Sequence, residues 1–368
     1  MGAPREMARW CAVGAWGCLV FVVLLDLVIP RTTAVLTVMF GFAPLIACAV
    51  LSPAATGAVA CVAAALSVLS GLWNQAWGTS QHILRVVDVV LVGAAAVGIA
   101  LVRTRREEQV ARLVVIADVA QRAILPKLPG RAGPVAVAVR YLSAAQDTTM
   151  GGDLYDCYRR SCAAGGGPER VRFIVGDVRG KGIAGVEQAA QVIRAFRQSA
   201  AVEPTLAGVA QEMDRYLSGS FDREEFVTAV LVDASDASHL ILVNCGHPPA
   251  LLRRSVDGQL SLLDAPAALP LGLGGLDVVP YRELVVPWGH RDRLLLYTDG
   301  LSEARDASGT FMSPLALGSA LSGPHLPGVM EAILRTVGRH STTGRLTDDL
   351  ALLLLEHTGP KAGPDSAA

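Results

Sequence analysis

The chain has 368 residues, of which 52% are hydrophobic and 18% are charged, and its formal net charge is −1. Such an apolar composition excludes a disordered, collagen-like or coiled-coil rod protein, and the near-neutral charge without a long basic run argues against nucleic-acid binding. A chain of this length is expected to form more than one unit, because one core rarely grows far beyond ~250 residues.

Charged side chains are sparse in the first part of the chain. Residues 1–102 contain only seven of them and include four apolar segments, at about 10–29, 34–51, 54–73 and 83–102. Each segment has about the 20 residues that a helix needs to cross a ~30 Å hydrocarbon layer. A cleavable signal peptide does not account for four such segments. We therefore predict a four-helix transmembrane region over residues 1–102.

The short flanks of these segments predict their orientation. Arginines precede the first segment and follow the fourth, at Arg5, Arg9, Arg103, Arg105 and Arg106, whereas the loops on the other side contain only Arg31 and Arg85. The positive-inside rule then places both termini in the cytoplasm. We expect a multi-pass protein of the plasma membrane in which everything after residue 103 is cytoplasmic.

Ionisable side chains gather at the predicted outer ends of the first and fourth helices. They are Asp26, Arg31, His82, Arg85 and Asp88, with Trp73 and Trp77 at the same level. Charged groups at membrane depth are costly and are functional candidates. Two interpretations follow: these residues pair with one another at the interface, which is the simpler one, or they sense an external ligand or protons.

Residues 103–130 are predicted to form a charged helical connector. A 3-4-3-4 spacing, which suits a two-stranded coiled coil, is kept by Val110, Leu113, Ala117, Ala120 and Ile124. Only about two heptads are present, so a homodimer through this connector and a helix that docks on the next domain fit the pattern equally well. Three prolines, beginning with Pro126, end the helix.

Residues 131–357 alternate between short strands and helices. Strands are predicted at about 134–142, 171–175, 226–232, 239–243, 283–286, 293–298 and 350–355, and helices at about 184–200, 205–217 and 328–339. Consecutive strands without intervening helices argue against a doubly wound parallel sheet. The predicted fold class is α+β, a β-sandwich flanked by helices. The tail, residues 358–368, is predicted to be disordered.

The seven cysteines indicate neither a zinc site nor a disulfide framework. Four lie in the apolar segments, and the other three have no paired spacing. Cys157 and Cys162 are close enough in sequence for a disulfide, but two free thiols are expected in a reducing compartment.

Aspartates stand at the ends of several predicted strands. Asp177 and Asp299 follow apolar runs, Asp348 and Asp349 precede one, and Asp153 follows two glycines. A carboxylate at a strand end is held on a rigid element yet faces a loop surface, as metal ligands do. Convergent carboxylates repel one another unless cations lie between them, and Mg²⁺ or Mn²⁺ prefer oxygen ligands. One such aspartate alone more often caps a turn. Glycines that permit close approach stand beside three of them: Gly152, Gly176 and Gly300.

Seven sequence blocks follow one another along the chain, and their succession is more informative than any one block. They are Gln121-Arg-Ala-Ile-Leu-Pro, Gly151-Gly-Asp-Leu-Tyr-Asp156, Val175-Gly-Asp-Val-Arg-Gly-Lys-Gly182, Phe226-Val-Thr-Ala229, Asn244-Cys-Gly-His-Pro-Pro249, Tyr297-Thr-Asp-Gly-Leu-Ser-Glu303 and Thr347-Asp-Asp-Leu-Ala351. This succession resembles the bacterial SpoIIE-like branch of the protein phosphatase 2C (PP2C) family over about residues 121–356. The membrane segment lies outside the resemblance and rests on hydropathy alone.

The resemblance implies a β-sandwich between helical layers, with two divalent metal ions, Mn²⁺ or Mg²⁺, at one end of a phosphatase domain over residues 131–357. A water shared between two such ions loses a proton near neutral pH and attacks phosphorus in line. The implied ligands are Asp177, which bridges both metals, the Val178 carbonyl beside it, Asp153 on one metal, Asp299 and Asp348 on the other, and Asp349 as a neighbouring or alternate ligand.

Two features depart from the eukaryotic PP2C pattern. The position two residues after the bridging aspartate, a histidine in eukaryotic relatives, is Arg179, and residues 143–150 contain no Arg or Lys to bind phosphate. Arg179 is therefore a candidate catalytic residue that holds the phosphoryl group. His247 is interpreted as structural rather than catalytic, because glycine and prolines around it indicate a rigid turn. Lys181 lies between two glycines that could bind an anion, but their spacing is not that of a nucleotide-binding P-loop.

Two functions of different classes fit these features. The first is a membrane-anchored protein serine/threonine phosphatase that acts on a phosphorylated regulatory protein, of the anti-anti-sigma type by family analogy. The second is a non-catalytic receptor or scaffold whose phosphatase-like domain only binds partners. Retention of Asp153, Asp177, Asp299 and Asp348 favours the enzyme. A small transporter is disfavoured, because four short spans show no repeated binding motif.

Overall fold

The computed structural model describes residues 3–28, 36–143, 152–160, 169–179, 183–222, 224–266, 268–274, 280–341 and 348–359, without the side chains of residues 3–5, 114–115, 117–123 and 183. The chain divides into two compact units, Met1–Arg112 and Leu113–Ala368, and each is described by itself.

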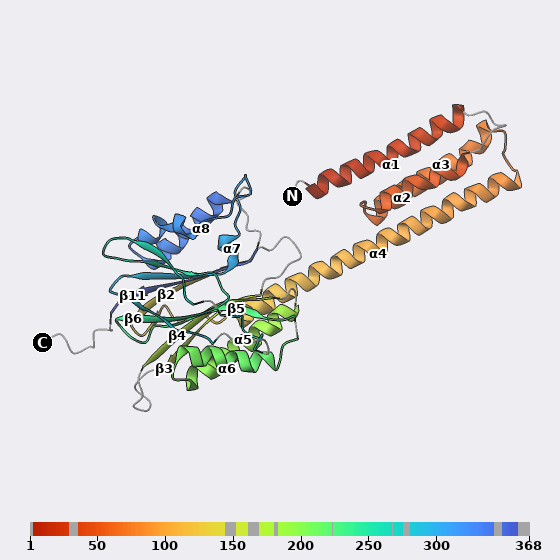
Figure 1. Ribbon diagram of the computed structural model, residues 1–368. Coiled ribbons are helices and arrows are strands. Elements are labelled where there is room, and N and C mark those ends of the chain that lie inside the picture. Colours follow the sequence, from red (N-terminus) through yellow and green to blue (C-terminus); the bar gives the residue numbers. More distant parts are fainter. Residues whose placement is uncertain are drawn as a thin grey trace. The chain divides into compact units, whose positions relative to one another are not determined.

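The first unit is helical (Figure 1). Its elements are α1 (Ala3–Val28), the 3₁₀ helix η1 (Thr37–Gly41), α2 (Phe42–Cys48), α3 (Pro53–Trp73) and the first part of α4 (Ser80–Ile124), which continues past Arg112. Ser52 caps α3 by accepting a hydrogen bond from Ala55 N at 3.3 Å, and Pro53 occupies the first helical position, where no intrahelical N–H is lost. Because α4 runs unbroken past Arg103, the predicted connector begins as the continuation of the last apolar helix.

Three helices are long and apolar enough to cross a membrane, over Glu6–Val28, Pro53–Trp73 and Ser80–Leu113. The second predicted span, residues 34–51, instead contains a short apolar helix over Thr37–Cys48. At the rise of α- and 3₁₀-helices this segment is only about 20 Å long, less than a ~30 Å hydrocarbon layer. Three of the four predicted spans are therefore present as helices of sufficient length, and the described residues of the second contain a shorter helix, because hydropathy measures apolar content and not helix length.

Asp26, near the end of α1, is buried, with 3% of its surface exposed. Its carboxylate accepts hydrogen bonds from Ser70 Oγ at 2.7 Å, Trp73 Nε1 at 3.0 Å, Asn74 Nδ2 at 3.0 Å and Leu36 N at 3.3 Å. These bonds tie the end of α1 to the end of α3 and to the chain before η1. Its described partners are thus neutral donors and not the charged neighbours of the interfacial interpretation; Arg31 lies outside the described residues.

The second unit is a sandwich of two antiparallel sheets (Figure 1). One sheet has the order β1 (Arg131–Ala132), β2 (Val135–Leu142), β11 (Leu350–His357), β10 (Arg293–Tyr297), β7 (Ala250–Arg253), β8 (Leu260–Leu263). The other has the order β3 (Asp153–Arg160), β4 (Arg170–Val178), β5 (Val227–Asp233), β6 (His239–Cys245), β9 (Leu284–Pro287). This architecture confirms the α+β class and the helix-flanked sandwich.

Helices cover both outer faces of the sandwich (Figure 1). α5 (Ile183–Val202) and α6 (Leu206–Ser218) pack on the β3–β9 sheet, and α8 (Leu326–His340) packs on the β1–β8 sheet. The short elements α7 (Asp299–Ser302), η3 (Pro314–Leu317) and η4 (Ala320–Ser322) lie between β10 and α8 along the chain. One apolar cluster joins the two sheets to α5 and α6, and a second lies beneath α8. The face of α8 turned to that cluster has the 3–4 spacing of an amphipathic helix, through Leu326, Val329, Met330, Ile333 and Val337.

The seven predicted strands and the three predicted helices of this unit are all present, with ends shifted by a few residues. The sequence pattern missed β1, β3, β7 and β8, and β1 has only two residues. β3 includes Asp153 and Asp156, a residue type that disfavours strands. β7 and β8 have four residues each, too few for a clear period of two.

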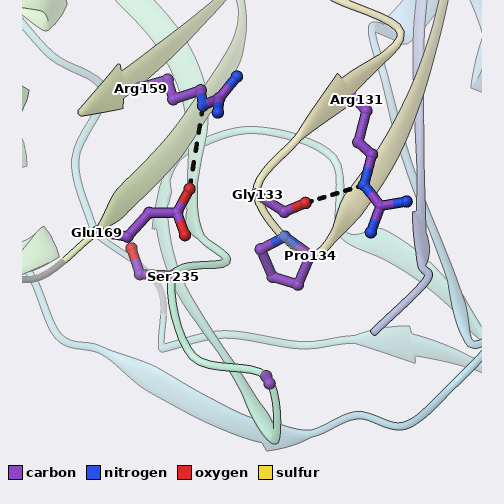
Figure 2. A pocket seen from close by; sticks show the side chains of 7 residues that line it. Arg131, Gly133, Pro134, Arg159, Glu169 and Ser235 are labelled. Carbon is purple, nitrogen blue, oxygen red and sulfur yellow. Dashed lines mark hydrogen bonds and ion pairs between the residues drawn. The ribbon is translucent and has the colours of Figure 1, made fainter. Parts of the chain in front are cut away.

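A cavity of about 540 Å³ lies at the end of the sandwich where β2 begins and β3 ends (Figure 2). Its walls carry both charge signs: Arg159 and Glu169 form an ion pair at 3.9 Å, and Arg131 Nε donates a hydrogen bond to Gly133 O at 3.2 Å. None of the aspartates predicted to bind metal lines this cavity.

Candidate metal centre

The strand register brings the predicted ligands to one end of the sandwich, opposite the end that contains the cavity beside Arg131 and Arg159. In the antiparallel β3–β4 pair Asp153 lies opposite Asp177, so the two carboxylates are neighbours at the same end of this sheet. Asp299 follows β10 in the facing sheet, and Asp348 immediately precedes Asp349 and the start of β11. Because β10 and β11 are antiparallel, the end of one lies beside the beginning of the other.

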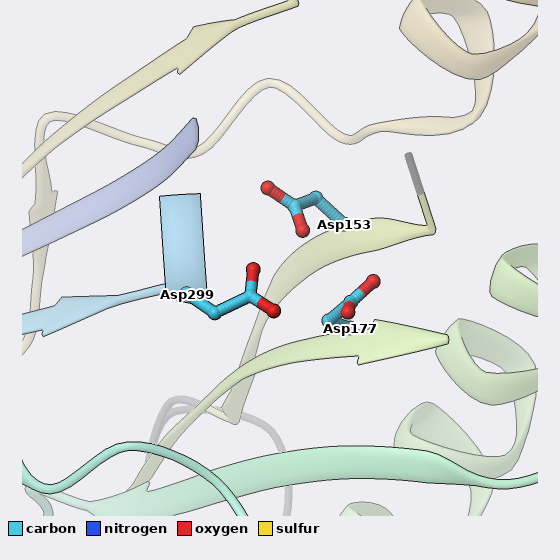
Figure 3. A group of neighbouring side chains, drawn as sticks. All are labelled: Asp153, Asp177 and Asp299. Atoms are coloured by element: carbon cyan, nitrogen blue, oxygen red, sulfur yellow. The ribbon is translucent and has the colours of Figure 1, made fainter. Parts of the chain in front are cut away.

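Three carboxylates meet at this end (Figure 3). One oxygen each of Asp153, Asp177 and Asp299 lies within 4.8 Å of the others, and no other group of this kind occurs among the described residues. Asp153 is 2% exposed, and the other two are half-buried. Partly buried carboxylates at such separations repel one another, and an all-oxygen donor set is the type that hard divalent cations prefer. The residues present therefore fit a divalent metal ion.

Glycines allow the backbone to close around this site. A Cβ on Gly152 would overlap the carbonyl oxygen of Val178, and a Cβ on Gly300 would overlap the carbonyl oxygen of Asp349. Gly152 O also accepts a hydrogen bond from Val178 N at 3.1 Å. These glycines are required by contact with backbone and not by a positive φ. The expectation that glycine beside the aspartates permits close approach is confirmed.

The pKa values of the three carboxyl groups are raised. Burial, followed by the charges of Asp299 and Asp348, raises the pKa of Asp177 to about 7. Burial and the neighbouring charge of Asp177 raise the pKa of Asp153 well above its ordinary value, against the hydrogen bond from Thr298. Burial and then Asp348 raise the pKa of Asp299. Without a cation, this end of the sandwich therefore resists full ionisation.

Asp348 and Asp349 have different surroundings. Asp348 is half-buried, and its charge acts on both Asp177 and Asp299, which places it next to the three-carboxylate group. Its Oδ1 accepts a hydrogen bond from Asp349 N at 2.8 Å. Asp349 is 2% exposed, and its carboxylate accepts a short hydrogen bond from the hydroxyl of Tyr141 on β2.

Arg179 lies beside the carboxylates, at the end of β4. Its guanidinium stacks on the ring of Phe226 at 5.1 Å, and the backbone N–H of Arg179 donates a hydrogen bond to Phe226 O at 2.9 Å. The side chain is exposed and lines a cavity of about 290 Å³, together with Asp177 and Asp299. A cation thus lines the same cavity as two candidate metal ligands. Lys181 lies outside the described residues.

His247 lines the same cavity but is itself 5% exposed. Its Nε2 lies 3.0 Å from Tyr297 O, and its Nδ1 lies 3.1 Å from Thr228 Oγ1. Burial lowers the pKa of His247 to about 4, so the ring is neutral at physiological pH. Both nitrogens are engaged inside the protein, which agrees with a structural role.

Three supporting residues were not found from the sequence. Thr298 Oγ1 donates a hydrogen bond to Asp153 Oδ2 at 2.7 Å and accepts one from Ala351 N at 2.9 Å. Tyr141 bonds to Asp349, and the exposed Glu303 adds a negative charge that raises the pKa of Asp177 and of Asp299. Thr298 and Glu303 lie in the sequence block Tyr297–Glu303. The role of Thr298 was not visible in the sequence, because its partner Asp153 lies 145 residues away along the chain.

Comparisons with known proteins agree with this geometry. The model of the family described as stage II sporulation protein E (SpoIIE) matches residues 167–358, just over half of the chain. The SiaA-PP2C domain of Pseudomonas aeruginosa superposes with a TM-score of 0.54 at 21% identity, covering 70% of this chain and 99% of that one. The RsbU and RsbW domains of Rv1364c from Mycobacterium tuberculosis give a TM-score of 0.51 at 23% identity, covering 62% of this chain and 63% of that one, slightly under two thirds of its length. At these identities the two structures establish a shared fold.

Proposed function

This chain belongs to the SpoIIE family of metal-dependent, PP2C-type protein phosphatases, and we propose that it is a membrane-anchored serine/threonine phosphatase. It removes phosphate from phosphoserine or phosphothreonine on a regulatory protein and uses two divalent ions, Mn²⁺ or Mg²⁺. The observation that carries the proposal is the convergence of Asp153, Asp177 and Asp299 from two sheets into one group of oxygens. A domain that only binds partners has no need of carboxylates held so close at a cost in burial and repulsion.

We assign the ligand roles as the family resemblance implies them, and the position of Asp177 supports its part. Asp177 neighbours Asp153 on the adjacent strand and Asp299 from the facing sheet, which suits it to bridge two ions, with the carbonyl of Val178 as the next backbone oxygen on β4. The remaining ligands are Asp153 for one ion, Asp299 and Asp348 for the other, and Asp349 as a neighbouring or alternate ligand. When bound, two divalent ions supply a water that is deprotonated near neutral pH and neutralise the phosphoryl oxygens.

We assign to Arg179 the binding of the phosphoryl group. Its planar guanidinium offers several N–H donors in a fork that matches phosphoryl oxygens, and stacking on Phe226 restricts its motion. The carboxylates of the cavity and this cation would then hold opposite sides of one phosphorylated residue. Its substrate class, a phosphorylated regulatory protein of the anti-anti-sigma type, is proposed by family analogy.

The test is turnover by the purified full-length chain on p-nitrophenyl phosphate and on a phosphoserine peptide, with Mn²⁺, with Mg²⁺ and with chelator. Activity is expected only with metal. Asp177→Asn should abolish turnover while the protein stays folded, because a bridging ligand that loses its charge releases both ions. Asp257→Asn, in the exposed β7–β8 turn, is the matched control and should keep normal activity. Activity that is indifferent to chelator would contradict the two-metal assignment, and an inactive but metal-binding wild type would favour the scaffold.

The membrane arrangement is a separate part of the proposal. We place both termini and the catalytic unit in the cytoplasm, on the arginine distribution, in a multi-pass anchor that crosses the membrane an even number of times. The helices α1, α3 and α4 are three of the crossings, and residues 34–51 return the chain between α1 and α3. Single cysteines introduced in a cysteine-free chain report the sides of the membrane through an impermeant thiol reagent in intact cells. A probe between Gln75 and Thr79 should be labelled, and a probe in the 360–368 tail should not. Labelling of the tail alone would invert the topology.

A further inference from the structure

His247 stands on the connection that crosses from one sheet to the other. It follows β6, a strand of the β3–β9 sheet, and precedes β7, a strand of the β1–β8 sheet. The side chain of Asn244 clamps its backbone: Asn244 Oδ1 accepts a hydrogen bond from His247 N at 2.7 Å, and Asn244 Nδ2 donates one to His247 O at 2.8 Å. The preceding Gly246 has a φ of +71°, which favours glycine, and packs against Pro270.

The two ring contacts reach one strand in each sheet. Thr228 belongs to β5 and pairs in register with Asp177, while Tyr297 is the last residue of β10, two residues before Asp299. A carbonyl oxygen only accepts, so the proton on the ring must lie on Nε2, which donates to Tyr297 O. Nδ1 of the neutral ring then accepts the hydroxyl hydrogen of Thr228.

We infer that His247 is a positioning residue that sets the separation between Asp177 and Asp299 and thereby the affinity of the site for divalent metal. The inference rests on the proposed metal-dependent function. Asp177 and Asp299 come from different sheets, which are held together mainly by apolar packing, and packing fixes their relative shift less precisely than a hydrogen bond does. At this end the hydrogen bond from Thr298 to Asp153 also joins the two sheets, but it does not reach the strand of Asp177. His247 supplies two hydrogen bonds at the metal end, one to each sheet. A change in their length would move the two carboxylates relative to each other.

Direct participation in the chemistry is a different role, and the geometry argues against it. Both nitrogens of His247 already have partners within the protein, and the side chain is 95% buried. A general acid needs a nitrogen that reaches the leaving group. The residue is therefore expected to change metal binding and not the proton-transfer step.

The experiment measures Mn²⁺ binding by titration calorimetry on the full-length chain in detergent, with no substrate present. His247→Phe keeps the ring volume but removes both hydrogen bonds, and its Mn²⁺ affinity should fall about 10–100-fold, the usual loss when a partner behind a metal ligand is removed. His247→Gln retains an amide N–H for Tyr297 O and should recover part of the affinity. His357→Phe is the matched control, because His357 is equally buried and ends β11 at the opposite end of the sandwich from the carboxylates.

Measurements of turnover distinguish a role of His247 in metal binding from a role in the chemical step. At saturating Mn²⁺, His247→Phe should regain kcat to within a few fold of the wild type, because the chemistry itself is intact. Wild-type Mn²⁺ affinity in folded His247→Phe would overturn the inference, and so would a kcat that stays low at saturating Mn²⁺. If His247→Phe does not fold, Thr228→Val, which removes the donor to Nδ1 with little change of shape, must show the weaker affinity instead. A wild-type chain that binds no Mn²⁺ would overturn the proposed function itself.

Discussion

Asp177 shows how the fold gives an ordinary side chain unusual properties. Its place after an apolar run was visible in the sequence, and so was the prediction that it binds metal. The pKa of about 7 was not visible, because it arises from burial and from the charges of Asp299 and Asp348, which are distant in sequence. A carboxyl group that is partly protonated at neutral pH in the absence of metal makes metal affinity fall as pH falls, since protons and cations compete for the same oxygens.

The raised pKa of Asp177 also predicts how the metal-free protein responds to pH. Between the unfolded value of 3.8 and the folded value of about 7, the folded state holds a proton that the unfolded state does not. Stability therefore falls as pH rises through this window, by up to about 1.4 kcal/mol per pH unit from this group. Asp177→Asn lacks the contribution, so with chelator present its stability relative to wild type should increase between pH 5 and pH 7.

Urea unfolding at several pH values measures this difference. Trp288 is the only tryptophan of the second unit and is 3% exposed, so in a background in which the four tryptophans of the first unit are replaced by phenylalanine its fluorescence reports unfolding of that unit. His247, whose lowered pKa acts in the opposite direction, is present in both proteins and cancels. Parallel curves for the two proteins would contradict the raised pKa, and saturating Mn²⁺ should reverse the decline in the wild type.

Contacts between elements explain which parts of the site the sequence could predict. Asp299 and Asp348 were recognised because each adjoins a long apolar strand, and those strands, β10 and β11, were predicted correctly. β3 was missed although it carries Asp153, because its polar residues are stabilised by partners from elsewhere, such as Arg197 on α5, which pairs with Asp156 at 2.6 Å. Strands that depend on distant partners carry little local signal.

Hydropathy has a similar limit in the first unit. It located all the apolar segments but could not show that the described residues of the second form the short helix Thr37–Cys48. Nor could it show that Asp26 is buried and bound by donors from the end of α3 and from Asn74, since those donors are 44 to 48 residues away in sequence. Local composition predicts where a chain is apolar, whereas hydrogen-bond partners are set by tertiary packing.

The contact between α7 and β11 yields a prediction at the scale of elements. Gly300 → Ala would place a Cβ on the carbonyl oxygen of Asp349 and force the start of α7 away from β11. Overpacking of this kind costs about 1–3 kcal/mol, and displacement of Asp299 should also weaken Mn²⁺ binding. Gly338→Ala in α8 is the control, because nothing lies within 4 Å of its added methyl group. There the better helix propensity of alanine should leave the protein as stable or up to about 1 kcal/mol more stable.

Unfolding midpoints and Mn²⁺ titrations on both glycine variants check this prediction. Equal stability and equal metal affinity for the two variants would mean that α7 moves freely relative to β11 and that the position of Asp299 is not fixed by this contact.

At the scale of the whole molecule, the important feature is that α4 is one continuous helix. It begins in the apolar segment at Ser80 and ends at Ile124, within the block Gln121–Pro126 that opens the phosphatase resemblance. Along the chain, α4 alone connects the last apolar segment to the catalytic unit, so if the first unit receives a signal, this helix is the covalent path to the catalytic unit. A helix transmits rotation or translation along its axis without a change in its own hydrogen bonding.

An insertion series in α4 tests this coupling. One residue inserted after Val110 should rotate everything downstream by about 100°, whereas seven residues nearly restore the original face. Phosphatase activity of the full-length chain in membranes should therefore change with insertions of one or three residues and largely recover with seven. The purified variants should bind Mn²⁺ equally, because the insertions lie outside the catalytic unit. If activity does not depend on the length of the insertion, the first 102 residues act only as an anchor. The buried Asp26 then stabilises the fold of that anchor and does not receive a signal.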